Sequence, residues 1–199
     1  MEWLLDAYRH GIFPWPIWEE GEPMAWWSLD PRAIIELDRG LHVTRRLRRT
    51  VRSQKFEITR DQDFRGVIRG CATSPGRRGR TWLTDEMVVA YTRLHDLGHA
   101  HSIEAWHAGM LAGGVYGVAI GGLFAAESMF YHVRDASKVA LVHLVDHLRA
   151  RGYLLLDIQQ WTGHSASLGA IEIPREEYLR RLATAIELPV SFGESADDK

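Results

Sequence analysis

Two polar residues at the end of an apolar strand are the first candidates for chemistry in this sequence. The apolar run 153–156 is typical of a strand that enters a core, and it leads into Asp157 and Gln159. Side chains two residues apart share a face of a strand. We therefore expect both to point the same way at the carboxyl end, where α/β sheets open ligand crevices. A strand-end aspartate that caps a helix or closes a turn is the alternative.

Glu127 is the second candidate, because it lies within an apolar strand predicted over 123–133. Strand alternation places it on one face with Ala125 and Met129, among apolar and small neighbours. A carboxylate in such surroundings must be paired or be held for a ligand, and an amine is its natural complement. A buried ion pair with an arginine or lysine of the fold is the alternative.

The sequence indicates neither a metal nor a cofactor. Several histidines lie close together (His95, His99, His101 and His107), but no cysteine ligand lies near them and no HExxH motif is present. The glycine-rich run 113–117 is not followed by the Lys-Ser/Thr of a phosphate loop. No glycine-rich segment opens a helix in the way that pyrophosphate-bearing acyl carriers require. We expect no cofactor and no metal.

Two arginine clusters stand out in a chain whose formal net charge is only -2. The first comprises Arg45, Arg46, Arg48, Arg49 and Arg52, and the second comprises Arg77, Arg78 and Arg80. Clustered arginines in a near-neutral protein suit a phosphate-binding face. A solvated helix side is the alternative.

Composition favours a cytoplasmic protein with its own core. The chain has 199 residues, of which 46% are hydrophobic, so it is long enough to bury a sizeable core. It has no run of 18 apolar residues, and its first residues carry no basic n-region of a secretory signal. The single cysteine, Cys71, excludes an internal disulfide and fits a reducing compartment.

The order of predicted elements indicates an α+β fold. Helices are expected over 2–10, 42–52 with Thr44 as N-cap, 63–71, 84–97 with Thr84 as N-cap, 135–151, 164–169 and from Pro174; strands are expected over 33–37, 56–59, 100–106, 110–119, 123–133, 153–158 and 170–173. Residues 11–30, rich in tryptophan and proline, are expected to be irregular. Three antiparallel strands, a long helix and a further strand form one half of an acetyltransferase-like fold.

The sequence also resembles the leucyl/phenylalanyl-tRNA–protein transferases from Tyr8 to about Leu182. The resemblance rests on seven segments in one order: YRHGIFPW, WWSLDPR, TWLTDEM, LGHAHSIEAW, GGVYGVAIGGLFAAESMF, DASK and LLLDIQ with HSASLGAIEIPREEY. It implies a small, shortened N-terminal domain over 1–30 and an acetyltransferase-like aminoacyl-transfer domain over 31–190. The acidic composition of residues 191–199 predicts a disordered tail.

The resemblance also implies site residues. Asp157 and Gln159 match the family's catalytic pair, and Glu127 matches a carboxylate of its substrate site. The other substrate-binding positions that it implies are Tyr8, Trp15, Trp82, Val115, Met129, Leu144, Leu148 and Leu156. For the last five of these, core packing is an equally good interpretation. The resemblance assigns at least one arginine cluster to tRNA phosphates.

The implied reaction moves leucine or phenylalanine, and also methionine, from aminoacyl-tRNA to proteins with N-terminal Arg or Lys, which marks them for N-end-rule degradation. No membrane partner is expected, and a monomer is favoured. Asp157 would act either as a general base or as an electrostatic orienter. An acetyl-CoA N-acyltransferase on the same scaffold and a non-catalytic module that binds tRNA ends or N-termini are the two alternatives.

Overall fold

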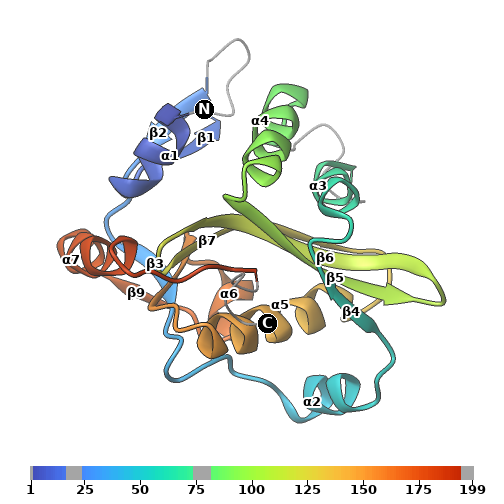
Figure 1. The fold of residues 1–199 in the computed structure, drawn as a ribbon. Coiled ribbons are helices and arrows are strands. Elements are labelled where there is room, and N and C mark those ends of the chain that lie inside the picture. Colours follow the sequence, from blue (N-terminus) through green and yellow to red (C-terminus); the bar gives the residue numbers. More distant parts are fainter. Residues whose placement is uncertain (1, 17–23, 74–81, 194–199) are drawn as a thin grey trace.

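The predicted α+β class is confirmed by the computed structural model, which describes residues 2–16, 24–73 and 82–193 (Figure 1). Its elements are α1 (Glu2–Arg9), β1 (Phe13–Pro16), β2 (Met24–Trp27), β3 (Arg32–Ile35), α2 (Arg45–Arg52), β4 (Glu57–Arg60), α3 (Phe64–Thr73), α4 (Asp85–Asp96), β5 (Ala100–His107), β6 (Met110–Ile120), β7 (Leu123–Tyr131), α5 (Ala136–Ala150), β8 (Leu155–Gln159), α6 (Gly163–Ser167), β9 (Ile171–Ile173) and α7 (Arg175–Ile186). Thr44 and Thr84 cap α2 and α4 as predicted, each accepting a hydrogen bond from a backbone N–H three residues on.

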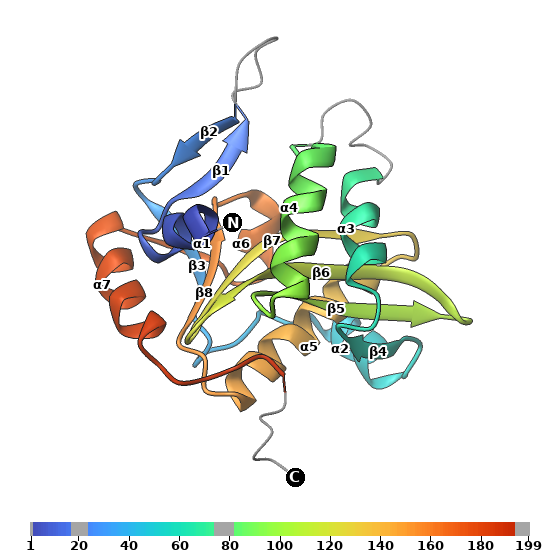
Figure 2. The same cartoon turned by 45° about the horizontal axis from the view of Figure 1, so that its top comes forward.

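A seven-stranded sheet in the order β4-β5-β6-β7-β8-β3-β9 forms the centre of the molecule. Neighbouring strands are antiparallel except β7 and β8, which pair in parallel across the α5 crossover. Helix α5 covers one face, while α3 and α4 cover the other; α7 packs on β7 and β8 and also contacts α1 (Figures 1 and 2). No helix in the described ranges is long and apolar enough to cross a membrane.

The central strands β7 and β8 separate towards one end. Their pairing runs from Leu123 opposite Leu155 to Ala125 opposite Asp157 and goes no further. Each strand has a bulge just beyond that point: Glu127 is the extra residue of β7 against β6, and Ile158 is the extra residue of β8 against β3. Bulges bend a strand and interrupt its ladder. Strands β7 and β8 therefore separate just beyond the last parallel pair, Ala125 and Asp157.

The bulge at Glu127 corrects one sequence expectation. Ala125 lies in the core on the α3 and α4 side, whereas Met129 packs against the core on the α5 side. The two were expected to share a face with Glu127. An extra residue shifts the side-chain alternation by one, so every later residue of the strand faces the other way.

The aromatic segment 11–30, which was expected to be irregular, contains two strands. Strands β1 and β2 pair antiparallel, with Phe13 opposite Trp27 and Pro16 opposite Met24. The prolines argued against strands because proline cannot donate to a ladder. In a two-stranded ribbon each strand is an edge, so a missing donor on its outer side costs no ladder bond.

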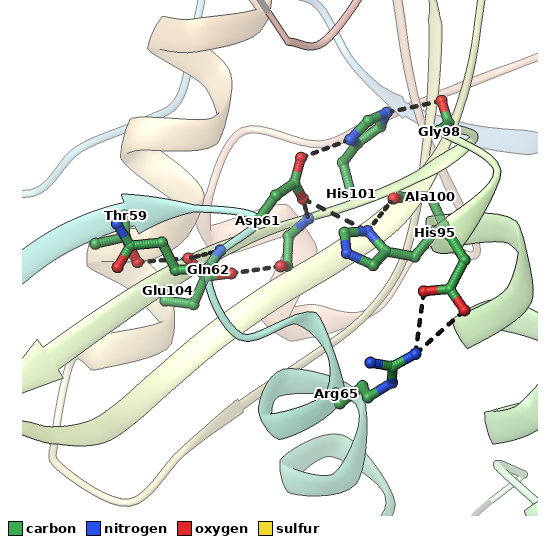
Figure 3. A network of polar contacts seen from close by, with 11 residues as sticks. Thr59, Asp61, Gln62, Arg65, His95, Gly98, Ala100, His101 and Glu104 are labelled. Carbon is green, nitrogen blue, oxygen red and sulfur yellow. Dashed lines mark hydrogen bonds and ion pairs between the residues drawn. The ribbon is translucent and has the colours of Figure 1, made fainter.

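A polar network connects β4 to the start of β5 (Figure 3). Asp61 accepts a hydrogen bond from the Ser102 backbone at 2.8 Å and contacts His101 Nδ1 at 2.7 Å. His95 Nδ1 lies 2.8 Å from the Ala100 carbonyl. These rings already have protein partners, and no group of three potential metal ligands occurs in the part of the chain that the structure describes.

The C-terminal segment folds back onto the sheet. Phe192 is 2% exposed, stacks on His101 with ring centroids 4.4 Å apart, and its carbonyl oxygen lies 2.7 Å from His147 Nε2. The acidic tail was expected to begin at residue 191, but the chain is packed as far as Phe192. The remainder of that tail, 194–199, lies outside the described residues.

Candidate active site

A cavity of about 390 Å³ occupies the space where β7 and β8 separate. Its polar lining includes Glu127, the extra residue of the β7 bulge, and Gln159, which follows the extra residue of β8. Val115 and Met129 supply apolar wall, together with Leu141 of α5. The cavity thus combines a few convergent polar groups with a largely apolar lining, which is typical of a small-molecule site.

Glu127 is the centre of a buried hydrogen-bond cluster. Gln159 Nε2 donates to its Oε1 at 3.1 Å, and the Tyr91 hydroxyl donates to its Oε2 at 3.1 Å. The Tyr8 hydroxyl lies 2.6 Å from that of Tyr91. Burial raises the pKa of Glu127 to about 8, and the two tyrosine hydroxyls oppose that shift. A cationic amine placed beside Glu127 would favour its ionised form.

Asp157 has different surroundings from Gln159. Its carboxylate forms a two-point ion pair with Arg32, at 2.9 Å from Nε and 2.6 Å from Nη2, and accepts a hydrogen bond from Tyr178 at 2.9 Å. Asp157 is fully buried, and it contacts Gln159 through the backbone N–H of that residue at 2.9 Å. The side chain of Gln159 is the one that reaches the cavity.

Arg32 was not identified as a site residue from the sequence. It is 1% exposed, lies over the rings of Phe13 and Tyr178 at 4.6 and 4.5 Å, and donates to the Gly11 carbonyl at 2.9 Å. A buried arginine must have a charged partner. The only signal in the sequence is the segment Asp30-Pro31-Arg32, which by itself indicates no more than a break in the chain.

Two tryptophans close the cavity on the N-terminal side. Trp15 of β1 and Trp82, just before α4, both line it, and their rings are 5.5 Å apart at 31°. Trp82 also meets Tyr91 edge to face at 6.0 Å. Flat aromatic faces that line a cavity suit the stacking of a nucleobase.

The remaining positions implied by the resemblance lie apart from the cavity lining. Leu144, Leu148 and Leu156 have 0% exposure and pack in the α5-side core. Tyr8 is buried and does not line the cavity, but its hydroxyl interacts with both Tyr91 and Glu127 and so belongs to the hydrogen-bond cluster of the site. Thr162 and His164, which were not among the predicted site residues, do line the cavity.

The first arginine cluster is exposed on α2. Arg45, Arg48 and Arg49 point to solvent, and Arg46 is paired with Asp135 at 3.2 Å. The second cluster, Arg77, Arg78 and Arg80, lies outside the described residues.

The cavity suits an acyl transfer between two bound substrates. It offers an amide that hydrogen-bonds without titrating and a carboxylate suited to an amine, beside apolar walls for a side chain. These features define a class of group-transfer site, and comparison with known proteins identifies the family.

Residues 34–183 match the family model for leucyl/phenylalanyl-tRNA protein transferase, and residues 1–30 match that for its N-terminal domain. A protein from Nitratidesulfovibrio vulgaris (strain DP4), named leucyl/phenylalanyl-tRNA–protein transferase, is 51% identical over 193 residues. The alignment covers 96% of this chain and 81% of the length of that protein. A protein of the same name from Magnetococcus marinus is 50% identical over 195 residues, with the same coverage. The chain therefore belongs to the leucyl/phenylalanyl-tRNA protein transferase family, as its motifs predicted.

A solved structure described as L-PGS from Bacillus licheniformis aligns with a TM-score of 0.45 and 14% sequence identity. The alignment covers 84% of this chain and 55% of the chain of that structure. That similarity is too low to support an argument about this protein.

Proposed function

We propose that this protein transfers leucine or phenylalanine, and also methionine, from aminoacyl-tRNA to the α-amino group of a protein. The observation that carries the proposal is the contact between Gln159 and Glu127 at a cavity with apolar walls. Family membership supplies the donor and acceptor classes.

The donor is already activated, because an aminoacyl-tRNA is an ester. The acceptor amine attacks the ester carbonyl carbon, and the tetrahedral intermediate collapses as the bond to the ribose oxygen breaks. The proton lost by the amine goes to that ribose oxygen, so the reaction balances without a covalent enzyme intermediate. Roughly a tenth of an α-amine with a pKa near 8 is neutral and nucleophilic at pH 7. The protein needs only to orient the substrates and stabilise the oxyanion.

Gln159 and Glu127 have the contact roles in this proposal. The amide of Gln159 donates to the developing oxyanion, and Glu127 binds the α-ammonium group of the donor amino acid. Asp157 is a positioning residue, because it holds the backbone N–H of Gln159 and is closed off from the cavity. Of the two roles that the sequence left open for Asp157, this geometry favours the orienter.

Substrate selection follows from the walls. Val115, Met129 and Leu141 would surround the transferred side chain, and Trp15 and Trp82 would stack on the terminal adenine. Acceptors with N-terminal Arg or Lys, a role in N-end-rule degradation, action in the cytoplasm and a monomeric state remain parts of the proposal that rest on the family resemblance.

The proposal is tested by incubating the protein with labelled Leu-tRNA and a peptide that begins with Arg. We expect transfer of the label to the peptide, and pretreatment of the donor with RNase should abolish it. Gln159→Ala should lower kcat by about 10²-fold, the cost of losing one oxyanion donor. The matched control is Gln62→Ala, an exposed glutamine on the β4–α3 connection, which should keep full activity. Label transfer from acetyl-CoA instead of Leu-tRNA would contradict the proposal.

A further inference from the structure

A second cavity, of about 440 Å³, adjoins the candidate active site at the N-terminus of α5. The two cavities share Met129 and His164 as walls. A ligand that extends out of the first cavity on this side would therefore enter the second cavity. The second cavity has a different lining, because Arg134 and Lys138 supply positive charge.

Its cations are available to a ligand. Neither Arg134 nor Lys138 has an ion-pair partner among the described residues, whereas the neighbouring Asp135 is neutralised by Arg46 at 3.2 Å. The pKa of His164 is lowered, first by burial and then by the positive charge of Lys138. The Lys138 ammonium therefore acts on the same space that His164 lines, and that space favours an anion.

Ser137 is an independent indication of a ligand. It is 4% exposed and lines this cavity, yet its hydroxyl has no hydrogen-bond partner in the described part of the chain. It lies in the first turn of the 15-residue helix α5, whose N-cap, Asp135, makes no side-chain cap. Helix N-termini favour negative charge. The Ser137 hydroxyl is not among the buried unpartnered atoms of the described residues, so it is open to the cavity and can donate to an oxyanion bound there.

An aromatic ring completes the cavity. Tyr131, at the end of β7, is 59% exposed and lines the same space. Arg134 also borders two smaller hollows that lead to Arg46 and Arg49 on α2. Phosphate-binding cations, a stacking ring and a continuing basic path together match a single nucleic-acid strand.

We propose that this second cavity binds the penultimate nucleotide of the donor tRNA. Ser137, Lys138 and Arg134 hold the phosphodiester that joins this nucleotide to the terminal adenosine, and Tyr131 stacks on its base. The inference rests on the proposed function, because the terminal adenosine must occupy the first cavity for its ester to reach Gln159.

The test compares two synthetic donors that differ by one nucleotide: 3′-O-leucyl-adenosine, which has no phosphate, and leucyl-cytidylyl-adenosine. Transfer to a peptide beginning with Arg is measured with the wild type and with Lys138→Gln, Ser137→Ala and Tyr131→Ala. Arg149→Gln is the matched control, since it removes one positive charge from the exposed C-terminal turn of the same helix.

For the wild type we expect a higher kcat/KM with the dinucleotide donor. Lys138→Gln and Tyr131→Ala should each lower that advantage roughly tenfold, the effect of losing one charge-assisted hydrogen bond or one stacked base. Ser137→Ala should lower it less, because it removes a neutral donor. Arg149→Gln should leave it unchanged, and transfer from leucyl-adenosine should be the same in all variants.

Two outcomes would overturn the inference while leaving the proposed function standing. One is a dinucleotide advantage that persists in Lys138→Gln, Ser137→Ala and Tyr131→Ala. The other is an equal loss with both donors, which would place these residues in the reaction itself. Failure of the wild type to transfer leucine from either donor or from Leu-tRNA would instead overturn the proposed function, and this inference with it.

Discussion

Arg32 and Asp157 are 125 residues apart in sequence and form a buried two-point ion pair, at 2.9 and 2.6 Å. Both side chains are only 1% exposed. The pair connects the segment that follows the N-terminal hairpin to the strand that carries Gln159, and the same carboxylate holds the Gln159 backbone. The same carboxylate therefore neutralises a buried charge and fixes the position of Gln159.

Asp157→Ala should destabilise the fold as well as impair transfer. Removing one partner leaves the Arg32 charge buried and uncompensated, which costs about 3–5 kcal/mol in comparable cases. Urea unfolding of the wild type and the variant measures this difference. The control is Asp96→Ala, which removes the partner of Arg65 in a pair that is more than half exposed, and it should cost less than about 1 kcal/mol. Equal effects of the two substitutions would contradict the buried-charge argument.

Glu127 should make stability depend on pH. Its folded-state pKa of about 8 lies above the ordinary value of 4.5, because burial disfavours the charged form. The folded protein therefore binds a proton that the unfolded chain has lost, and stability falls as pH rises from about 4.5 to about 8. Above that range this contribution to the slope disappears.

Glu127→Gln isolates that contribution, since glutamine has the same shape and does not titrate. The free energy of unfolding, measured by urea at several pH values from 5 to 9, should decline less steeply in the variant than in the wild type. Parallel pH profiles would show that Glu127 ionises normally in the folded protein.

The arginines of α2 should bind tRNA phosphates. Removing one arginine–phosphate ion pair should reduce the slope of log K against log salt by about 0.9. Neutralising Arg45, Arg48 and Arg49 together should therefore weaken donor binding and flatten its salt dependence. Arg180→Gln on α7, an exposed arginine paired with Glu177, is the control and should leave the slope unchanged. An unaltered slope in the triple variant would indicate that the arginines of α2 form a solvated helix surface and do not bind tRNA phosphates.

Met129 should determine donor selectivity from the wall of the cavity. A single methylene is worth only about 1–3 kcal/mol, so Leu, Phe and Met should be discriminated imperfectly and Arg rejected for want of a partner. Met129→Ala should shift preference from Leu towards Phe. Competition between Leu-, Phe-, Ile- and Arg-tRNA measures this donor preference. The control is Leu154→Ala, at a leucine that is 56% exposed, which should leave the preference unchanged. Efficient transfer of Ile or Arg would refute the assignment of this wall.

Local features of the fold were predictable from the sequence. Thr44 and Thr84 were expected as helix N-caps, and the structure has both caps. Such features depend on hydrogen bonds within a few residues, which the sequence specifies directly. The family followed from segments whose order and content are equally local.

The arrangement of the site depended on partners distant in sequence. A bulge arises only when two strands pair out of step, so the displacement of Glu127 and Ile158 was set by β6 and β3, not by their own segments. For the same reason the alternation rule failed for Met129, and Gln159 adopts φ +58 at its strand end. The sequence by itself determined the family, the fold class and the residues to suspect. Only tertiary pairing decided that Gln159 faces the cavity while Asp157 is enclosed with Arg32, because buried charges must find partners wherever the fold brings them.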